Sequence, residues 1–129
     1  IIITHDLGVV ANIAKKVQVM YSGKIIERGL TEELFYNAQH PYTWALLKSV
    51  PRFDAGHKGE LYSIQGTPPD LIRIPKGCSF ASRCSYCMSI CLEQMPEKTK
   101  LSETHEVLCW LKHPLAPKVQ IHEGFGGNK

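Results

Sequence analysis

Residues 17–28, with the sequence VQVMYSGKIIER, have the pattern of two β-strands joined by a tight turn. The segment 17–21 alternates around Gln18 with the period of a half-buried β-strand. The dipeptide Ser22-Gly23 is typical of a tight two-residue turn, and the run over residues 24–28 predicts a return strand. We therefore expect an antiparallel β-hairpin.

The residues before this hairpin predict a strand and then a helix. The three isoleucines of residues 1–3 are apolar and β-branched, which favours a strand buried on both faces. Asp6 suits the N-cap of a helix, because the residues after it place apolar side chains on one helical face at Leu7, Val10, Ala11 and Ala14.

Two further helices are expected after the hairpin. Thr31 and the acidic residues that follow it predict a helix over residues 32–37, with Thr31 as its cap. Pro41 fits the first turn of a third helix, which continues towards Val50. We interpret residues 39–42 as the entry to that helix and as an aromatic anchor for the core.

The composition of the chain changes after Pro51. Residues 53–59 are rich in glycine and charge, which is typical of a linker, and residues 60–64 predict a strand. A domain boundary is therefore expected between residues 51 and 60.

Overall composition limits the class of function. The chain has 129 residues, 43% of them hydrophobic, which is enough for one modest core. Its formal net charge of +3, with Lys and Arg scattered, does not indicate nucleic-acid binding. No apolar stretch approaches the ~18 residues that span a bilayer, so we expect any membrane association to come through another protein.

The five cysteines are the strongest compositional signal. All lie in the second half of the chain, at Cys78, Cys84, Cys87, Cys91 and Cys109. Without a secretory signal, such a cluster favours metal binding over a disulfide framework. Structural zinc sites usually contain a C-x2-4-C knuckle, so a zinc site of three cysteines and one histidine can be drawn from Cys84, Cys87, Cys91 and His105. Iron-sulfur clusters accept more varied spacing, because their iron corners lie several ångströms apart. Spacing alone leaves both open.

Three sequence motifs, in this order along the chain, resemble segments of one protein family. They are IIITHDLGVVANIAKKVQVMYSGKIIERG (residues 1–29), AQHPYTWALLKSVP (residues 38–51) and GCSFASRCSYCMSIC (residues 77–91), the last followed by HEVLC (residues 105–109). The first is similar to the stretch after the Walker B strand in ATP-binding subunits of ABC transporters. The other two resemble segments of the oligopeptide and dipeptide importer branch, so the resemblance covers residues 1–111.

The resemblance implies a role for His5. In this family the strand before this histidine lies in the parallel sheet of the nucleotide-binding domain, and the histidine reaches the γ-phosphate of ATP. A neutral imidazole can donate to a phosphate oxygen from one nitrogen while the other orients the ring. His5 is thus the candidate catalytic and ATP-binding residue. From the residues alone, the alternative is a histidine that closes the strand and caps the next helix.

Two ATPase motifs do not occur in the chain. It has no G-x-x-x-x-G-K-[ST] phosphate loop, and no Walker B Asp-Glu pair precedes Ile1. We therefore expect the C-terminal part of a longer ATPase that uses ATP and Mg²⁺, and no ATP hydrolysis by this chain alone. Because residues 1–3 would be an unpaired strand, we also expect self-association.

For the cysteines, the resemblance implies a [4Fe-4S] cluster, with zinc as the alternative. The implied ligands are Cys78, Cys84, Cys91 and Cys109. Cys87 is then a bystander thiol beside the cluster. Arg83 and Lys76 flank the ligands and are candidates to balance the cluster charge, although ordinary solvated side chains are equally consistent.

Taken together, the residues and the resemblance predict an α/β fragment. Residues 1–50 are expected to end an ABC-type nucleotide-binding domain, residues 51–111 to form a small Cys-rich α+β extension, and residues 112–129 to be an extended or disordered tail. The expected function is that of an ATP-binding subunit of an oligopeptide or dipeptide importer, coupling ATP hydrolysis to transport and carrying a metal-cluster regulatory module.

The expected partners are a second ATP-binding subunit, the transmembrane permease subunits and an extracytoplasmic peptide-binding protein, at the cytoplasmic face of the cell membrane. Nucleic acid is not an expected partner. The alternative is a stand-alone zinc-binding, Cys-rich protein-interaction module.

Overall fold

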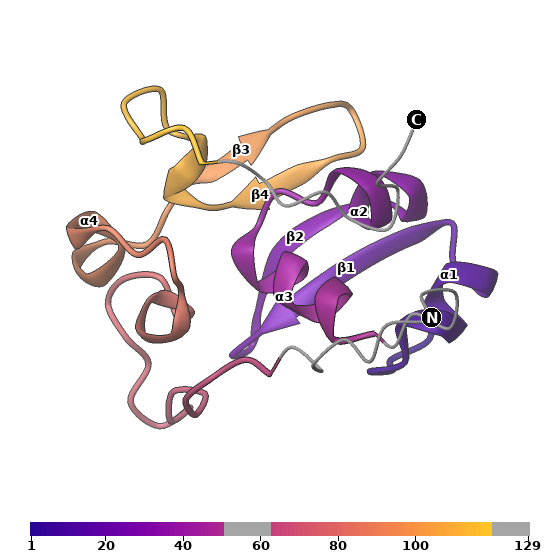
Figure 1. Ribbon diagram of the computed structural model, residues 1–129, viewed down its shortest axis with the longest axis horizontal. Helices are drawn as coiled ribbons and strands as arrows, with labels where there is room; N and C mark the ends of the chain where they lie inside the picture. Colours follow the sequence, from indigo (N-terminus) through magenta and orange to yellow (C-terminus); the bar gives the residue numbers. More distant parts are fainter. Residues whose placement is uncertain (51–62, 120–129) are drawn as a thin grey trace, which may run out of the picture.

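A four-stranded antiparallel sheet organises the part of the chain that the computed structural model describes, residues 1–50 and 63–119. Its strands are β1 (Lys16–Tyr21), β2 (Lys24–Leu30), β3 (Lys98–Lys100) and β4 (Glu106–Leu108), in the spatial order β1-β2-β4-β3. Figure 1 shows the β3–β4 pair lying beside the β1–β2 hairpin, with β4 next to β2. The sheet therefore joins residues from before and after the expected linker. The boundary predicted between residues 51 and 60 lies outside the described residues.

The predicted hairpin is confirmed. β1 and β2 pair antiparallel from Lys16↔Leu30 to Tyr21↔Lys24. The turn residues Ser22 and Gly23 have φ of 49° and 77°. Two successive residues with positive φ match the right-handed twist of the flanking strands, which is why a small residue and a glycine occupy this turn.

A β-bulge in β2 changes which side chains are buried. Val19 pairs with Glu27 and Met20 with Ile25, so Ile26 is an extra residue on β2. The extra residue interrupts the regular alternation by which successive side chains of β2 point to opposite faces of the sheet. As a result Ile26 and its neighbour Glu27 are both buried, with exposed fractions of 2% and 1%. The bulge therefore places a carboxylate inside the protein.

Three helices occupy the predicted positions. They are α1 (Leu7–Ile13), α2 (Thr31–Asn37) and α3 (Pro41–Ser49). Asp6 caps α1 as predicted, because its Oδ1 accepts hydrogen bonds from the N–H groups of Gly8 (2.9 Å) and Val9 (3.1 Å). Pro41 is the first residue of α3, also as predicted.

The prediction that Thr31 caps α2 is wrong. Thr31 is the first residue of the helix, and its hydroxyl donates to the carbonyl oxygen of Ala14. The side chain of Glu33 caps instead, because its Oε2 accepts from the N–H of Leu30 at 2.8 Å. A carboxylate at the third helical position accepts from the N–H of the N-cap residue, which is one of the unpaired N–H groups at the start of a helix.

The prediction of a buried strand over residues 1–3 is not met. These isoleucines are in no strand and are exposed, with fractions of 123%, 62% and 96%. A strand needs neighbours for its backbone hydrogen bonds, and none of the described residues pairs with this segment. The expected self-association through these side chains stays a prediction.

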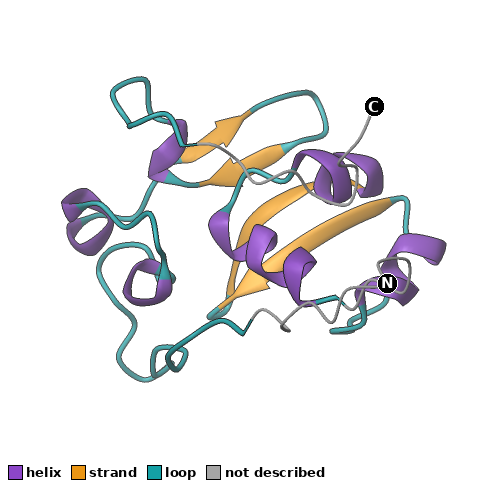
Figure 2. Ribbon diagram, viewed as in Figure 1, coloured by secondary structure: helices purple, strands orange, loops and turns teal. Residues whose placement is uncertain are grey.

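The segment that carries most of the cysteines is built of short elements. It contains the 3-10 helix η1 (Ala81–Arg83) and the helix α4 (Ser89–Glu93), and a second 3-10 helix, η2 (Trp110–Lys112), follows β4. Figure 2 shows that loops and turns make up most of the described chain between residue 63 and β3. Residues 63–64 are not in a strand, and the rest of the strand expected at 60–64 lies outside the described residues.

The core consists of two clusters of buried side chains. The first packs Val19, Tyr21 and Ile26 of the hairpin against Leu34 of α2 and Phe80. The second is formed by Ala38, Trp44 and Leu47, against which Tyr86, Leu111 and Val119 pack. Residues after Cys109 thus pack against this second cluster. Within the described segments, no helix is both long enough and apolar enough to cross a membrane.

Candidate metal centre

Four of the five cysteines come together around one small pocket. Cys78 precedes η1, Cys84 follows it, Cys91 lies in α4, and Cys109 comes directly after β4. The rest of the wall is mostly apolar and includes Phe80, Tyr86, Trp110 and Leu111, together with His40 at the start of α3. The fifth cysteine, Cys87, is exposed and does not line this pocket. The structure therefore gathers the four cysteines that the resemblance implied.

These four thiols come from three separate parts of the chain, and one glycine allows two of them to approach. The N–H of Cys78 donates to the carbonyl oxygen of Cys91 at 2.7 Å. A Cβ on Gly77 would lie 2.2 Å from that oxygen and 2.7 Å from the carbonyl carbon of Leu92. Glycine at position 77 is thus required by the close contact between the two backbones.

Backbone N–H groups point at the sulfur atoms. The backbone N–H groups of Phe80 and Ala81 favour the ionised form of Cys78 and so act to lower its pKa, and the N–H of Tyr86 does the same for Cys84. The N–H of Leu111 likewise acts to lower the pKa of Cys109, and the N–H of Met88 donates a hydrogen bond of 3.5 Å to the sulfur of Cys91. Such donors stabilise negative charge on sulfur, as the thiolates of metal centres require.

Burial opposes ionisation of the thiols while they carry no metal. It raises the pKa of Cys84 to about 11 and that of Cys109 to about 12, and it raises the pKa of Cys78 as well. These three groups are therefore protonated at neutral pH. A metal that binds them as thiolates must displace protons, so binding is expected to weaken in acid.

The alternative zinc site of Cys84, Cys87, Cys91 and His105 does not form. His105 is 2% exposed, and its Nε2 donates to Oε1 of Glu27 at 2.8 Å. It does not line the cysteine pocket. Among residues 1–50 and 63–119, no three His, Cys, Asp or Glu side chains are arranged to hold a single metal ion. Cys84, Cys87 and Cys91 also do not share a helix, because α4 begins only at Ser89.

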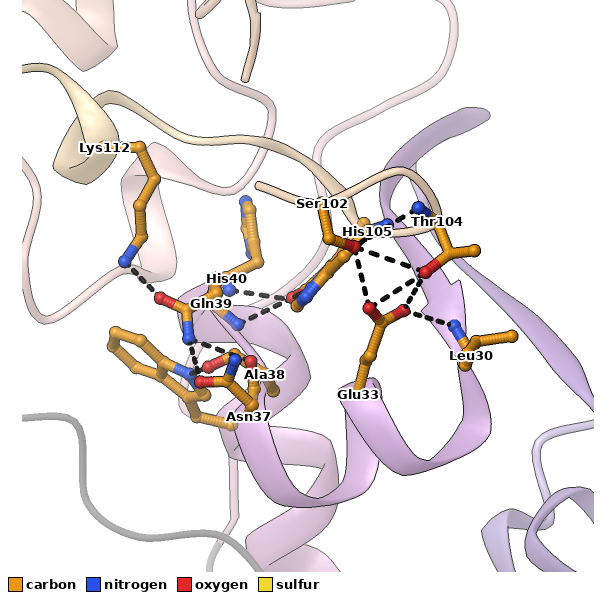
Figure 3. Close-up of polar contacts among 12 residues, drawn as sticks. Leu30, Glu33, Asn37, Ala38, Gln39, His40, Ser102, Thr104, His105 and Lys112 are labelled. Atoms are coloured by element: carbon orange, nitrogen blue, oxygen red, sulfur yellow. Dashed lines mark hydrogen bonds and ion pairs between the residues drawn. The ribbon is translucent and has the colours of Figure 1, made fainter. Parts of the chain in front are cut away.

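The carboxylate of Glu27 organises the loop beside the pocket. Its Oε1 accepts from the N–H of Gln39 at 2.6 Å and from His105, and its Oε2 accepts from the N–H of His40 at 3.0 Å. Figure 3 shows Gln39, His40 and His105, the three residues that these contacts bring together from the start of α3 and from just before β4. Sequence reasoning missed this group, because the alternation of a regular strand does not reveal that the bulge buries Glu27.

Arg83, a candidate to balance cluster charge, has a different set of partners. Its guanidinium donates to the carbonyl oxygens of Ile64 and Gln65, each at 3.0 Å, and to the hydroxyl of Tyr21 at 3.2 Å. The Arg83 side chain therefore links residues 64–65 to β1. Lys76 is exposed.

His5 lies far along the chain from the cysteines, in an exposed turn. The hydroxyl of Thr4 accepts from the N–H of Asp6 at 3.0 Å, and Asp6 in turn caps α1. The backbone on both sides of His5 is thus fixed while the imidazole faces outward. Its side chain does not cap α1, so the simple structural role considered for it is not the observed one.

Comparison with known proteins gives a consistent result. Residues 26–91 match the family described as "Oligopeptide/dipeptide transporter, C-terminal region". The chain is 56% identical over 123 residues to the oligopeptide transport ATP-binding protein OppD of Bacillus subtilis (strain 168), which covers 95% of this chain and 34% of that protein.

Two further relatives agree with this match. The chain is 56% identical over 120 residues to the oligopeptide transport ATP-binding protein AmiE of Streptococcus pneumoniae serotype 4, and 53% identical over 119 residues to the dipeptide transport ATP-binding protein DppD of Lactococcus lactis subsp. cremoris. These matches cover 93% and 92% of this chain and 34% of each relative. The chain therefore spans about a third of the length of these curated relatives.

Proposed function

Because the chain belongs to the family of oligopeptide/dipeptide transporter C-terminal regions, we propose that it is the C-terminal part of an ATP-binding subunit of a peptide importer. The observation that carries this proposal is the similarity over 95% of the chain to a protein named for oligopeptide transport and ATP binding. In the whole protein, hydrolysis of ATP with Mg²⁺ would drive the import of oligopeptides or dipeptides. The extent of the match favours this function over a stand-alone interaction module.

The proposed partners follow from the same function. An importer of this kind needs a second ATP-binding subunit, permease subunits that cross the membrane, and an extracytoplasmic protein that delivers the peptide. The ATP-binding subunit would lie at the cytoplasmic face of the membrane. The test is reconstitution of the full-length subunit with its permease in vesicles. ATP-dependent uptake of a labelled peptide supports the proposal, and ATP hydrolysis without any peptide uptake contradicts it.

We propose that His5 contacts the γ-phosphate of ATP in the full-length subunit. Its support is the turn in which Thr4 and Asp6 fix the backbone and leave the imidazole exposed. In the full-length protein, His5→Ala is expected to remove most ATP turnover while nucleotide binding is retained. His113→Ala, at another exposed histidine, is the matched control and should keep full turnover. Equal turnover in both variants would contradict the role of His5.

We further propose that Cys78, Cys84, Cys91 and Cys109 hold a [4Fe-4S] cluster. The supporting observations are the pocket that the four cysteines share and the N–H of Met88, which donates to the sulfur of Cys91 at 3.5 Å. A cluster has its iron atoms at separate corners and so accepts more widely spaced thiolates. When bound, it would supply metal–thiolate bonds that link the three cysteine-bearing parts of the chain.

The experiment is metal analysis of protein purified without oxygen. We expect iron and acid-labile sulfide in equal amounts and a brown visible absorption. Cys84→Ser and Cys109→Ser should lose both, whereas Cys87→Ser, the matched control, should keep both. Zinc without sulfide, or loss of iron in the Cys87→Ser variant alone, would show that the ligand set is wrong.

A further inference from the structure

His40 forms part of the wall of the cysteine pocket, but it is not one of the four proposed ligands. It lies between α2 and α3, directly before Pro41, and is 1% exposed. Its ring packs 5.9 Å from the ring of Phe80, centroid to centroid, and Phe80 also lines the pocket. The imidazole is therefore buried beside the four thiols rather than at the surface.

The hydrogen bonds of His40 determine which ring nitrogen carries the proton. The N–H of Tyr42 donates to Nδ1 at 3.0 Å, which caps α3. A nitrogen that accepts a hydrogen bond carries no proton, so the neutral ring is protonated at Nε2. Burial lowers the pKa of His40 from 6.5 to about 4, and the ring is thus neutral at pH 7. Nε2 is consequently an N–H donor.

This donor has no acceptor among residues 1–50 and 63–119, the part of the chain that the structure describes. Nε2 of His40 is buried and makes no hydrogen bond. Buried polar atoms nearly always have a partner, and one without a partner calls for an explanation. Figure 3 shows the ring of His40 turned away from the side chain of Gln39, its neighbour in the chain. His40 lines the cysteine pocket, so a group bound there can supply the missing acceptor.

We propose that Nε2–H of His40 donates a hydrogen bond to a sulfur atom of the iron-sulfur cluster in the cysteine pocket. The inference rests on the proposed cluster, and it adds a donor from a side chain to the donors from the backbone. Sulfur in such a centre carries negative charge and is an acceptor, whereas the apolar neighbours of His40 in the pocket are not.

Glu27 holds His40 in place for this role. Its carboxylate accepts from the backbone N–H of His40 and from that of Gln39, so β2 fixes the position of the residue that starts α3. Glu27 is thus a positioning residue. The donor itself is the imidazole.

A hydrogen bond to cluster sulfur stabilises the reduced state more than the oxidised state, because the reduced state carries more negative charge. Removal of the donor should therefore lower the midpoint potential. A tenfold loss of preference for the reduced state corresponds to a shift of about 59 mV for a one-electron couple. We expect a shift of that order to more negative potential.

The test compares two substitutions at one position in the full chain loaded with its cluster. His40→Asn keeps an oxygen that can accept from Tyr42 and so preserves the cap of α3, but it removes the donor at Nε2. His40→Gln places an amide N–H₂ at the reach of Nε2. We expect His40→Asn to retain its iron and to have the more negative midpoint potential, and His40→Gln to lie closer to the wild type.

A second measurement needs no variant. In ¹⁵N NMR of the wild type, the tautomer of His40 should have its proton on Nε2, and cluster loading should protect this proton from exchange. A proton on Nδ1, or fast exchange of the Nε2 proton in the loaded protein, would overturn the inference. Equal potentials for wild type and His40→Asn overturn it while the cluster stands. Absence of iron and sulfide in the wild type overturns the cluster, and this inference with it.

Discussion

Replacement of Glu27 by alanine should strongly destabilise the protein. The carboxylate is 1% exposed and accepts three hydrogen bonds, from the N–H of Gln39 (2.6 Å), the N–H of His40 (3.0 Å) and Nε2 of His105 (2.8 Å). Alanine would leave these donors buried without an acceptor, and each one costs about 1–3 kcal/mol. Breaking a buried pair by removal of one partner costs about 3–5 kcal/mol, and we take this as the expected total.

The assay is urea unfolding of the metal-free protein, followed by tryptophan fluorescence. With a slope of about 2 kcal/mol/M, a loss of about 4 kcal/mol lowers the unfolding midpoint by about 2 M. Glu27→Gln should lie between the wild type and Glu27→Ala, because its amide oxygen still accepts while its NH₂ faces other donors. Glu103→Ala, at an exposed position of the same sign, should change stability by no more than about 0.5 kcal/mol. A loss below about 1 kcal/mol for Glu27→Ala would refute the reasoning.

Three other substitutions test separate features of the structure. Hydrogen bonding from the N–H of Leu30 holds the pKa of Glu33 below its ordinary value of 4.5, so the carboxylate stabilises the fold above that pH and this contribution is lost as the pH falls. Glu33→Gln should therefore be less stable than the wild type at pH 7, and the gap should close in thermal melts below pH 4.5; a constant gap would contradict the assignment. Gly77→Ala should lose about 1–3 kcal/mol and most of its iron, because its Cβ would lie 2.2 Å from a carbonyl oxygen, whereas Gly8→Ala should keep its iron. Arg83→Lys cannot bond both carbonyl oxygens as the guanidinium does, so amide exchange of residues 64–66 should accelerate; unchanged protection would count against the observed contacts.

The parts of the fold that depend on neighbouring residues could be predicted from the sequence. Ser22-Gly23 indicates its own turn, Asp6 caps the next residues, and Pro41 fixes the first turn of α3. In each case the physical cause lies within a few residues of the signal. The thiol set at the pocket was also anticipated, but from the family resemblance, since spacing alone did not distinguish it from a set with Cys87.

The features that were missed depend on residues far apart in the chain. The extra residue Ile26 shows itself only when β1 and β2 are paired, and it is this bulge that buries Glu27. His105 was considered as a zinc ligand, yet its Nε2 bonds to Glu27, which lies 78 positions earlier in the chain. His40 was interpreted as part of a helix entry, and this is confirmed. The sequence did not indicate that its Nε2 would be buried without a hydrogen-bond partner, in a residue that lines the cysteine pocket.

The order of the strands also constrains how the chain can fold during synthesis. β2 pairs with β4 through Glu27↔Val107 and Arg28↔Glu106, so its partner is made about 80 residues later. At roughly 5–20 residues per second, a ribosome needs about 4–16 s to cover that distance. During this time one edge of β2 carries unpaired N–H and C=O groups, which is the kind of edge on which chains aggregate. The nascent protein is therefore most vulnerable between the emergence of its first hairpin and that of its second.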